Sequence, residues 1–288
     1  MPLKSFLQIW LDEYKKDTIR KNTYLLHQRN IQKHILPYFI VHTTMFNAME
    51  KAVTLAKIEK NPCLGVTIKG QSKNDGIMFM ESSDIPRFLQ ATLQYDYIYW
   101  IFFKVLIETG MRKGEAAALR WPDIDFKKYT ISITKTLDFG AKNKTELFGD
   151  TKTFNSNRTI KISQSLINDL KHHLSYQNKN KLGFDELYHH DLNLVLCRKD
   201  GNFILKSTLF NSFSRTLKKV NVPSMPIHSL RHTLAVLLME TGADMKYIQE
   251  RLGHGSMQIT ADVYAHISKK IESDNMRKFE DHMQKIYE

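Results

Sequence analysis

An apolar segment in the first half of the chain, residues 97–108 (YIYWIFFKVLIE), constrains the fold most. It is shorter than the roughly 20 residues that a membrane-spanning helix needs, and apolar side chains cover most of its circumference. We therefore expect a buried helix in the core of a globular domain. Gly110 follows directly, and glycine is the residue that most often ends a helix. With 42% hydrophobic and 25% charged residues among 288, the chain has the composition of a folded protein, not a disordered one.

Two segments further along alternate between polar and β-branched residues, 130–134 (TISIT) and 158–162 (RTIKI). Alternation with a period of two predicts strands. A polar, glycine-containing loop is expected between them, at residues 138–157. A helix capped by Ser82 or Ser83 is expected to run through Gln90 or beyond. Helical patterns fill most of the rest, at residues 164–178, 206–219, 228–240, 244–251, 257–265 and 268–286. The fold class expected is α+β, mostly helical, with a small antiparallel sheet.

The first 75 residues differ from the rest in charge density, because they carry half of the chain's net charge of +12. Three helices are expected here, at residues 5–16, from Asn22-Thr23 onwards, and at 43–60 before Asn61-Pro62. Residues 69–76 read as a linker. We expect two domains, a small helical one at 1–75 and a larger one at 76–288. An ordinary solvated face would explain the lysines of the first domain, but taken with the motifs further along the chain a basic clamp on a DNA backbone is the favoured interpretation.

The basic composition favours nucleic acid or an anionic membrane as partner. No apolar run reaches the length of a membrane span, and the first residues lack the pattern of a signal peptide. The two cysteines, Cys63 and Cys197, do not form a C-x-x-C motif, so neither a disulfide framework nor a thiolate zinc site is expected. A cytoplasmic protein is the natural expectation.

Six residues suited to phosphodiester chemistry are spread over the second domain. They are Arg112 in TGMRKGE, Lys152 in TKT, His228 and Arg231 in HSLRH, His254 in LGH, and Tyr264 in TADVYAH. Arginine is permanently charged and binds phosphate oxygens in a bidentate manner. A tyrosine hydroxyl has an ordinary pKa of about 10, so it needs neighbouring bases or positive charge to act as a nucleophile.

The order and local context of these six residues, from about Ser82 to the end of the chain, resemble the tyrosine recombinase (phage integrase) family. Members of that family cut and rejoin DNA through a covalent phosphotyrosine. The resemblance implies a mixed α/β catalytic domain with these roles: Tyr264 as nucleophile, Arg112 and Arg231 as the phosphate clamp, His228 as proton acceptor or phosphate ligand, His254 as a donor to a phosphate oxygen, Lys152 as general acid, and Glu115 as a carboxylate that orients the site. Lys142 and Lys144 are alternatives to Lys152 in the same loop region.

The resemblance also implies double-stranded DNA attachment sites as substrate, a homotetramer on DNA, and a host DNA-bending protein and an excision factor as further candidate partners. It implies no membrane, no metal and no cofactor, and places the protein in the bacterial cytoplasm at the nucleoid. The tail, residues 268–286, is expected to pack on a neighbouring protomer, or else on its own domain.

Two departures from the family and one competing motif keep other interpretations open. The first domain is shorter than the family's usual core-binding domain, and the additional N-terminal arm-site domain of many integrases is not seen. A decayed integrase that only binds DNA is therefore one alternative, and a type IB topoisomerase-like enzyme that relaxes DNA is another. His228 and His232 have the spacing of a zinc protease motif, but Ser229 stands where that motif requires glutamate.

Overall fold

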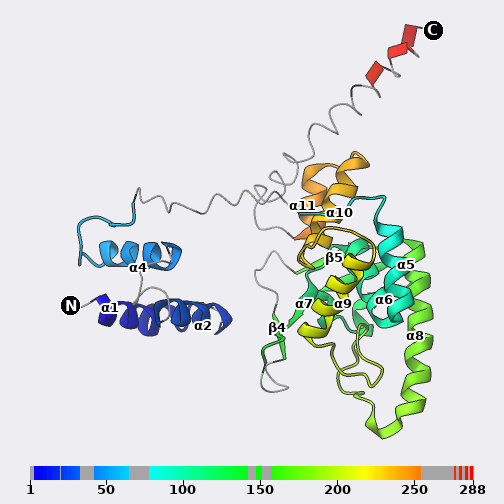
Figure 1. Ribbon diagram of the computed structural model, residues 1–288, viewed down its shortest axis with the longest axis horizontal. Coiled ribbons are helices and arrows are strands. Elements are labelled where there is room, and N and C mark those ends of the chain that lie inside the picture. The colour runs from blue at the N-terminus through cyan, green and yellow to red at the C-terminus, as the bar shows by residue number, and fades with distance from the viewer. Residues whose placement is uncertain are drawn as a thin grey trace. The chain divides into compact units, whose positions relative to one another are not determined.

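The computed structural model describes residues 3–19, 21–32, 42–64, 78–141, 147–150 and 157–253, and seven positions between 276 and 287 (Figure 1). The chain divides into two compact units, Met1–Asn74 and Asp75–Glu288, and each is described by itself. No helix among the described residues is long and apolar enough to cross a membrane.

The first unit contains helices α1 (Leu3–Ile9), α2 (Lys21–Asn30) and α4 (His42–Thr54), with a π-helical turn at Trp10–Lys15 that continues α1. Its core is small and is formed by α1, the π-helical turn, α4 and the residue that follows α2. The buried side chains are Phe6, Leu7, Trp10, Leu11, Ile31, Ala48, Met49 and Ala52.

Helix α4 was expected to reach residue 60, but it ends at Thr54. Ala56 takes a left-handed conformation (φ 51°), which turns the chain back. The Asn61 side chain then donates to the Phe46 carbonyl (3.1 Å) and to Glu50 Oε1 (2.7 Å). These bonds hold the segment after the helix against α4.

Helix α6 (Tyr97–Thr109) is the apolar helix expected from the sequence, and it is buried along most of its length. Asp96 caps it by accepting from the Ile98 amide (2.9 Å), and Gly110 ends it in the left-handed conformation (φ 66°). A Cβ at position 110 would overlap the side chains of Leu234 and Leu252, so glycine is also required by packing. Helices α5, α7, α8 and α10 contact α6.

The expected cap at Ser82 or Ser83 is wrong. Helix α5 spans Ile85–Tyr95 and begins after Asp84, which closes a turn by donating its amide to the Glu81 carbonyl (3.0 Å). Pro86 lies in the first turn of the helix, where its missing N–H costs no hydrogen bond.

The main sheet has the antiparallel order β1-β2-β5, formed by Ile124–Asp125, Thr130–Ile133 and Arg158–Lys161. Both expected strands are present, and Ile131 lies opposite Ile160 in the register. A second sheet pairs β3 (Lys135–Leu137) with β4 (Phe148–Asp150). Strand β4 lies where only a loop was expected. Its ladder with β3 is anchored by the buried side chains of Leu137 and Leu147.

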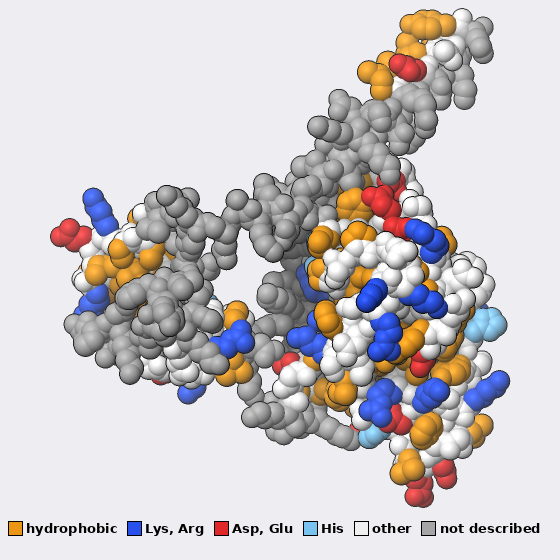
Figure 2. Space-filling view, viewed as in Figure 1, with side chains coloured by type: hydrophobic (Ala, Val, Ile, Leu, Met, Phe, Trp, Pro, Cys, Tyr) orange, Lys and Arg blue, Asp and Glu red, His pale blue; other side chains and the backbone are white. Residues whose placement is uncertain are grey.

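The remaining helices are α7 (Lys113–Ala118), α8 (Gln164–Phe184), α9 (Lys206–Lys219), α10 (Ser229–Glu240) and α11 (Met245–Leu252), with short 3-10 turns at Trp121–Asp123 and Asp185–Leu187. The α+β, mostly helical fold expected from the sequence is confirmed. The expected helix at 257–265 lies outside the described residues, as does most of 268–286. Lysine and arginine side chains are spread over the visible face of the second unit (Figure 2).

Candidate active site

Arg112 stands at the start of α7 and is held there by Glu115. The Glu115 carboxylate accepts from the Arg112 amide (2.9 Å) and from Arg112 Nη1 (2.7 Å). The bond to the amide is one half of a helix capping box, and a guanidinium bond to the same carboxylate is added to it, because arginine has no acceptor to complete the other half. The Arg112 side chain is 33% exposed whereas that of Glu115 is 2% exposed, so Glu115 orients a cation that a ligand can reach.

A second arginine, Arg158 on β5, also pairs with Glu115. Its Nη2 lies 2.9 Å from Glu115 Oε2, and its side chain is only 7% exposed. Its Nε donates to the carbonyl of Arg251 at the end of α11 (2.9 Å). Burial alone would raise the pKa of the Glu115 carboxyl, but the charge and hydrogen bond of Arg158, together with Arg112, hold it below its ordinary value. Glu115 is therefore ionised at neutral pH.

Arg231 is the most deeply buried arginine of the group, at 1% exposure in the first turn of α10. Its guanidinium donates to the carbonyls of Gly110 (2.8 Å) and Leu252, which end α6 and α11. Burial, and then repulsion from Arg112 and Arg158, lower the pKa of Arg231 to about 9, so it stays protonated at neutral pH. Arg112 and Arg158 pair with Glu115, and Arg231 lies close enough to be repelled by both, so this arginine cluster carries an excess of positive charge.

His228 precedes α10, and its ring lies 5.0 Å from that of His232 in a perpendicular arrangement. Partial burial of the ring, followed by the charges of His232 and Arg231, lowers the pKa of His228 to about 4. The residue is nevertheless exposed to solvent. A neutral imidazole at this position can accept a proton. Among the described residues, no group of three or more histidine, cysteine and acidic side chains could hold a metal ion.

Helices α10 and α11 contact each other, and α11 also contacts β5 (Figure 1). The fold therefore brings Arg112, Glu115, His228 and Arg231 to one region of the second unit. The other expected site residues, Lys152, His254 and Tyr264, lie outside the described residues, as do Lys142 and Lys144. Gly253, which precedes His254, ends α11 in the left-handed conformation (φ 65°).

From its sequence pattern Arg158 is predicted only as part of a strand, but the structure places it beside the candidate site. One signal was available, because Arg158 and Ile160 are two residues apart on β5 and so share one face of the sheet. Ile160 is buried. An arginine on an inward-facing position requires a buried acceptor, and Glu115 is that acceptor.

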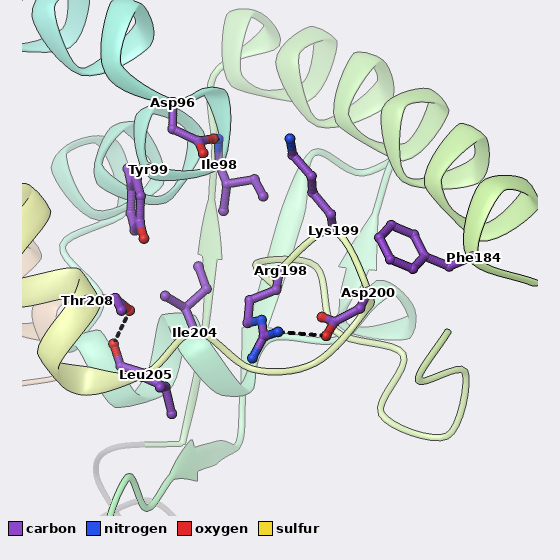
Figure 3. Close-up of a pocket in the computed structure, with 10 residues that line it drawn as sticks. All are labelled: Asp96, Ile98, Tyr99, Phe184, Arg198, Lys199, Asp200, Ile204, Leu205 and Thr208. Carbon is purple, nitrogen blue, oxygen red and sulfur yellow. Dashed lines mark hydrogen bonds and ion pairs between the residues drawn. The ribbon is translucent and has the colours of Figure 1, made fainter. Parts of the chain in front are cut away.

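A cavity of about 380 Å³ lies elsewhere in the second unit (Figure 3). It opens between the start of α6, the end of α8 and the loop before α9, and the ion pair of Arg198 and Asp200 (2.9 Å) forms part of its wall. It shares no residue with the arginine cluster, so it adds nothing to the candidate active site.

Comparison with known proteins agrees with this geometry. The model of the phage integrase family matches residues 78–270, and that of the phage integrase N-terminal SAM-like domain matches residues 3–41. The first of these covers more than half of the chain. The protein belongs to the phage integrase family.

Three individual proteins illustrate the likeness. A tyrosine recombinase XerC-like protein of Caldanaerobacter subterraneus subsp. tengcongensis is 30% identical over 251 residues, 83% of this chain and 63% of the relative. The ICEBs1 integrase of Bacillus subtilis is 27% identical over 279 residues, 94% of this chain and 74% of the relative. The structure of the Tn1549 transposon integrase in complex with transposon right end DNA has a TM-score of 0.76 at 16% identity, covering 97% of this chain and 99% of that one. The chain thus spans just under two thirds of the XerC-like relative and about three quarters of the Bacillus integrase.

Proposed function

We propose that this protein is a site-specific DNA recombinase that cleaves and rejoins DNA strands through a 3′-phosphotyrosyl intermediate, for integration or excision of a mobile element. The observation that carries the proposal is the arginine cluster, in which Arg112 and Arg158 pair with the Glu115 carboxylate and Arg231 lies close enough to be repelled by both arginines. A phosphodiester supplies the negative charge that this cluster lacks. Membership in the phage integrase family favours recombination over DNA relaxation or DNA binding alone.

In the proposed reaction, the Tyr264 hydroxyl attacks the phosphorus atom and the 5′ oxygen leaves. Negative charge builds on the non-bridging oxygens, and two guanidinium groups stabilise it. Arg112 is exposed enough to bind directly. Arg231 is 1% exposed, so its surroundings must open when DNA binds.

Proton transfers complete the scheme. His228, whose lowered pKa leaves its imidazole neutral at pH 7, is the proposed acceptor of the Tyr264 hydroxyl proton or a ligand of the phosphate. Lys152 gives a proton to the departing 5′ oxygen, and His254 donates to a phosphate oxygen. In the reverse step a 5′ hydroxyl attacks the phosphotyrosine and releases Tyr264. The ester conserves the energy of the broken bond, so ATP is not consumed.

Double-stranded DNA attachment sites are the proposed partner, with residues 1–75 as a DNA-binding domain and 76–288 as the catalytic domain. The relatives with solved structures include a Tn1549 integrase bound to DNA, which supports this choice. Helix α9 of the second unit offers four exposed basic side chains that suit a phosphate backbone. They are Lys206, Arg215, Lys218 and Lys219. We place the protein in the bacterial cytoplasm at the nucleoid, with a host DNA-bending protein and an excision factor as candidate partners.

A homotetramer on DNA is part of the same proposal, because exchange between two duplexes involves four cleaved strands. Three apolar side chains of the tail are exposed, Met276 by 59%, Phe279 by 58% and Ile286 by 59%. Exposed apolar groups at helical spacing favour docking on a neighbouring protomer.

A nicked suicide duplex that carries the end sequence of the encoding element tests the proposal. Cleavage releases a short fragment, which traps the covalent protein–DNA adduct. We expect the unaltered protein to form the covalent adduct and to recombine two paired sites. Binding without any adduct would leave only a DNA-binding protein, and relaxation of supercoiled DNA without recombination would indicate a topoisomerase.

A further inference from the structure

Three arginines donate to three consecutive carbonyls at the end of α11. Arg158 bonds the carbonyl of Arg251 (2.9 Å), Arg231 that of Leu252, and Arg112 that of Gly253 (3.2 Å). Helix C-termini carry partial negative charge, so cations are favoured there. Two of these arginines form the clamp of the proposed function, and the third has no role in it.

Arg158 joins the two clamp residues. Through Glu115 it acts on Arg112, because the carboxylate that accepts from Arg158 also accepts from the Arg112 amide and Nη1. Through the end of α11 it acts on Arg231, because the carbonyl that Arg158 holds is adjacent to the one that Arg231 holds.

Packing fixes Arg158 itself. Its side chain is 7% exposed and lies so close to Gly253 that a Cβ there would come within 3.1 Å of Arg158 Cδ and Nη1. Strand β5 anchors its backbone through pairing with Ile133 on β2. A side chain with these neighbours can set the position of other groups and has little freedom of its own.

We propose that Arg158 is a positioning residue for phosphodiester cleavage, one that aligns Arg112 and Arg231 by fixing Glu115 and the end of α11. This inference rests on the proposed recombinase function. A positioning role can be distinguished from a purely structural ion pair. If Arg158 positions the clamp, the loss of cleavage rate on substituting Arg158 depends on whether Arg112 is present.

The test measures single-turnover cleavage of the suicide duplex and, separately, binding of the same duplex. Side chains that orient the ligands of a metal site typically contribute about 10–100-fold to activity, and we expect the same scale for a residue that orients phosphate ligands. Arg158→Gln should therefore slow cleavage by about that factor and leave the DNA dissociation constant nearly unchanged. Arg158→Lys keeps the charge but cannot reach both Glu115 and the Arg251 carbonyl, so it should recover little of the rate.

A double-mutant cycle measures the coupling between Arg112 and Arg158 in the cleavage rate, and a purely structural role of Arg158 would give no coupling. In an Arg112→Ala background, Arg158→Gln should add much less to the loss than it costs alone. Lys104→Met is the matched control, because it breaks a largely buried ion pair of the same domain, Lys104 with Asp169 (2.8 Å), outside the cluster. We expect it to lower stability with little effect on cleavage.

Several results would overturn the inference. Losses that multiply in the double variant, a full rate in Arg158→Gln, or full recovery by lysine would each show that Arg158 does not position the clamp. A slow Lys104→Met variant of matched stability would assign the effect to stability alone. If the unaltered protein gives no adduct, the proposed function fails and this inference falls with it, whereas an active protein with an indifferent Arg158 loses only the inference.

Discussion

Glu115 holds Arg112 at two points, the backbone amide at 2.9 Å and the guanidinium Nη1 at 2.7 Å. The first bond fixes where α7 begins, and the second fixes where the side chain points. Because both use one carboxylate, the start of the helix and the direction of the proposed phosphate ligand are set together. The Arg158 charge stabilises the buried Glu115 carboxylate. Arg112 therefore need not neutralise Glu115 fully, and part of its charge remains available for a phosphate.

The first prediction concerns Glu115. Glu115→Gln removes a buried charge from between two arginines and leaves Arg158 buried without its counter-ion. Breaking a buried pair in this way is strongly destabilising, and we expect a loss of about 3 kcal/mol in the free energy of unfolding, measured with urea. The control is Asp84→Asn, which breaks an ion pair whose partner Arg87 is 62% exposed and should cost about 1 kcal/mol or less. Equal losses in the two variants would contradict the structural role of Glu115.

The second prediction concerns the nucleophile. Tyr264→Phe removes only the hydroxyl, so the covalent adduct with the suicide duplex should disappear while DNA binding stays nearly intact. The adduct is read on a denaturing gel and binding on a native gel. An adduct that persists in Tyr264→Phe would show that another residue attacks the phosphate. Tyr247→Phe, at an exposed tyrosine on α11, is the matched control and should keep the adduct.

The third prediction separates the two clamp arginines. Arg112→Ala and Arg231→Ala should each cost about 3–4 kcal/mol in cleavage, the value of one lost oxyanion donor. They should differ in stability, because Arg231 is 1% exposed and its loss leaves the carbonyls of Gly110 and Leu252 without that donor. Thermal unfolding should therefore shift more in Arg231→Ala than in Arg112→Ala. Cleavage at a normal rate in either variant would make that arginine structural, and strong inhibition by EDTA would revive a metal mechanism.

How far the sequence predicts this structure differs from element to element. The bounds expected for α9, 206–219, are those observed, because its polar and apolar positions alternate at helical period between two clear ends. Helix α8 runs six residues beyond the expected end at 178. That extension is mostly solvent-exposed, so no apolar pattern marks it. Strand β4 has three residues and owes its existence to β3, which local patterning does not reveal.

The candidate site shows the same division. Motif spacing was enough to select Arg112, Glu115, His228 and Arg231, and the structure gathers them in one region. Motif spacing could not predict the bond between Glu115 and Arg158, which are 43 residues apart, nor the bond between Arg112 and Gly253, which are 141 residues apart. Such contacts depend on how α7, β5 and α11 pack, and packing is a property of the whole domain.

The fourth prediction concerns acid stability. His173 is 1% exposed, and burial lowers its pKa from 6.5 to about 4. The folded state therefore binds this proton less readily than the unfolded chain, so stability is full above about pH 6.5 and falls as the pH drops towards 4. His173→Leu should reduce this slope by up to one proton, about 1.4 kcal/mol per pH unit. The Val195 carbonyl keeps Gln177 as a donor (2.6 Å), so the variant should fold.

The control for that measurement is His172→Leu at the exposed neighbour. Urea unfolding at pH 7.5, 6, 5 and 4.5 gives the slope for each variant. An unchanged slope in His173→Leu would mean that the ring is protonated in the folded state.

The fifth prediction concerns the tail. Met276, Phe279 and Ile286 are each more than half exposed, so their contribution to the core of their own chain is small. If they dock on a neighbouring protomer, deletion from Ser268 should leave DNA binding by the monomer but weaken the assembly of paired sites and recombination. It should also uncouple cleavage among the four sites. Light scattering with and without paired duplexes reports the assembly, and thermal unfolding reports the fold.

A point variant makes the tail test independent of the deletion. Phe279→Ser removes one apolar group, and the neighbouring Glu280→Gln changes an exposed polar one. Since burying an aromatic ring contributes about 2 kcal/mol, Phe279→Ser should weaken tetramer assembly by roughly 30-fold per docked ring and leave the unfolding temperature unchanged. Glu280→Gln should change neither. Normal tetramers and normal recombination by the truncated chain would contradict docking between protomers, and a lower unfolding temperature in Phe279→Ser would place the side chain in the core of its own domain.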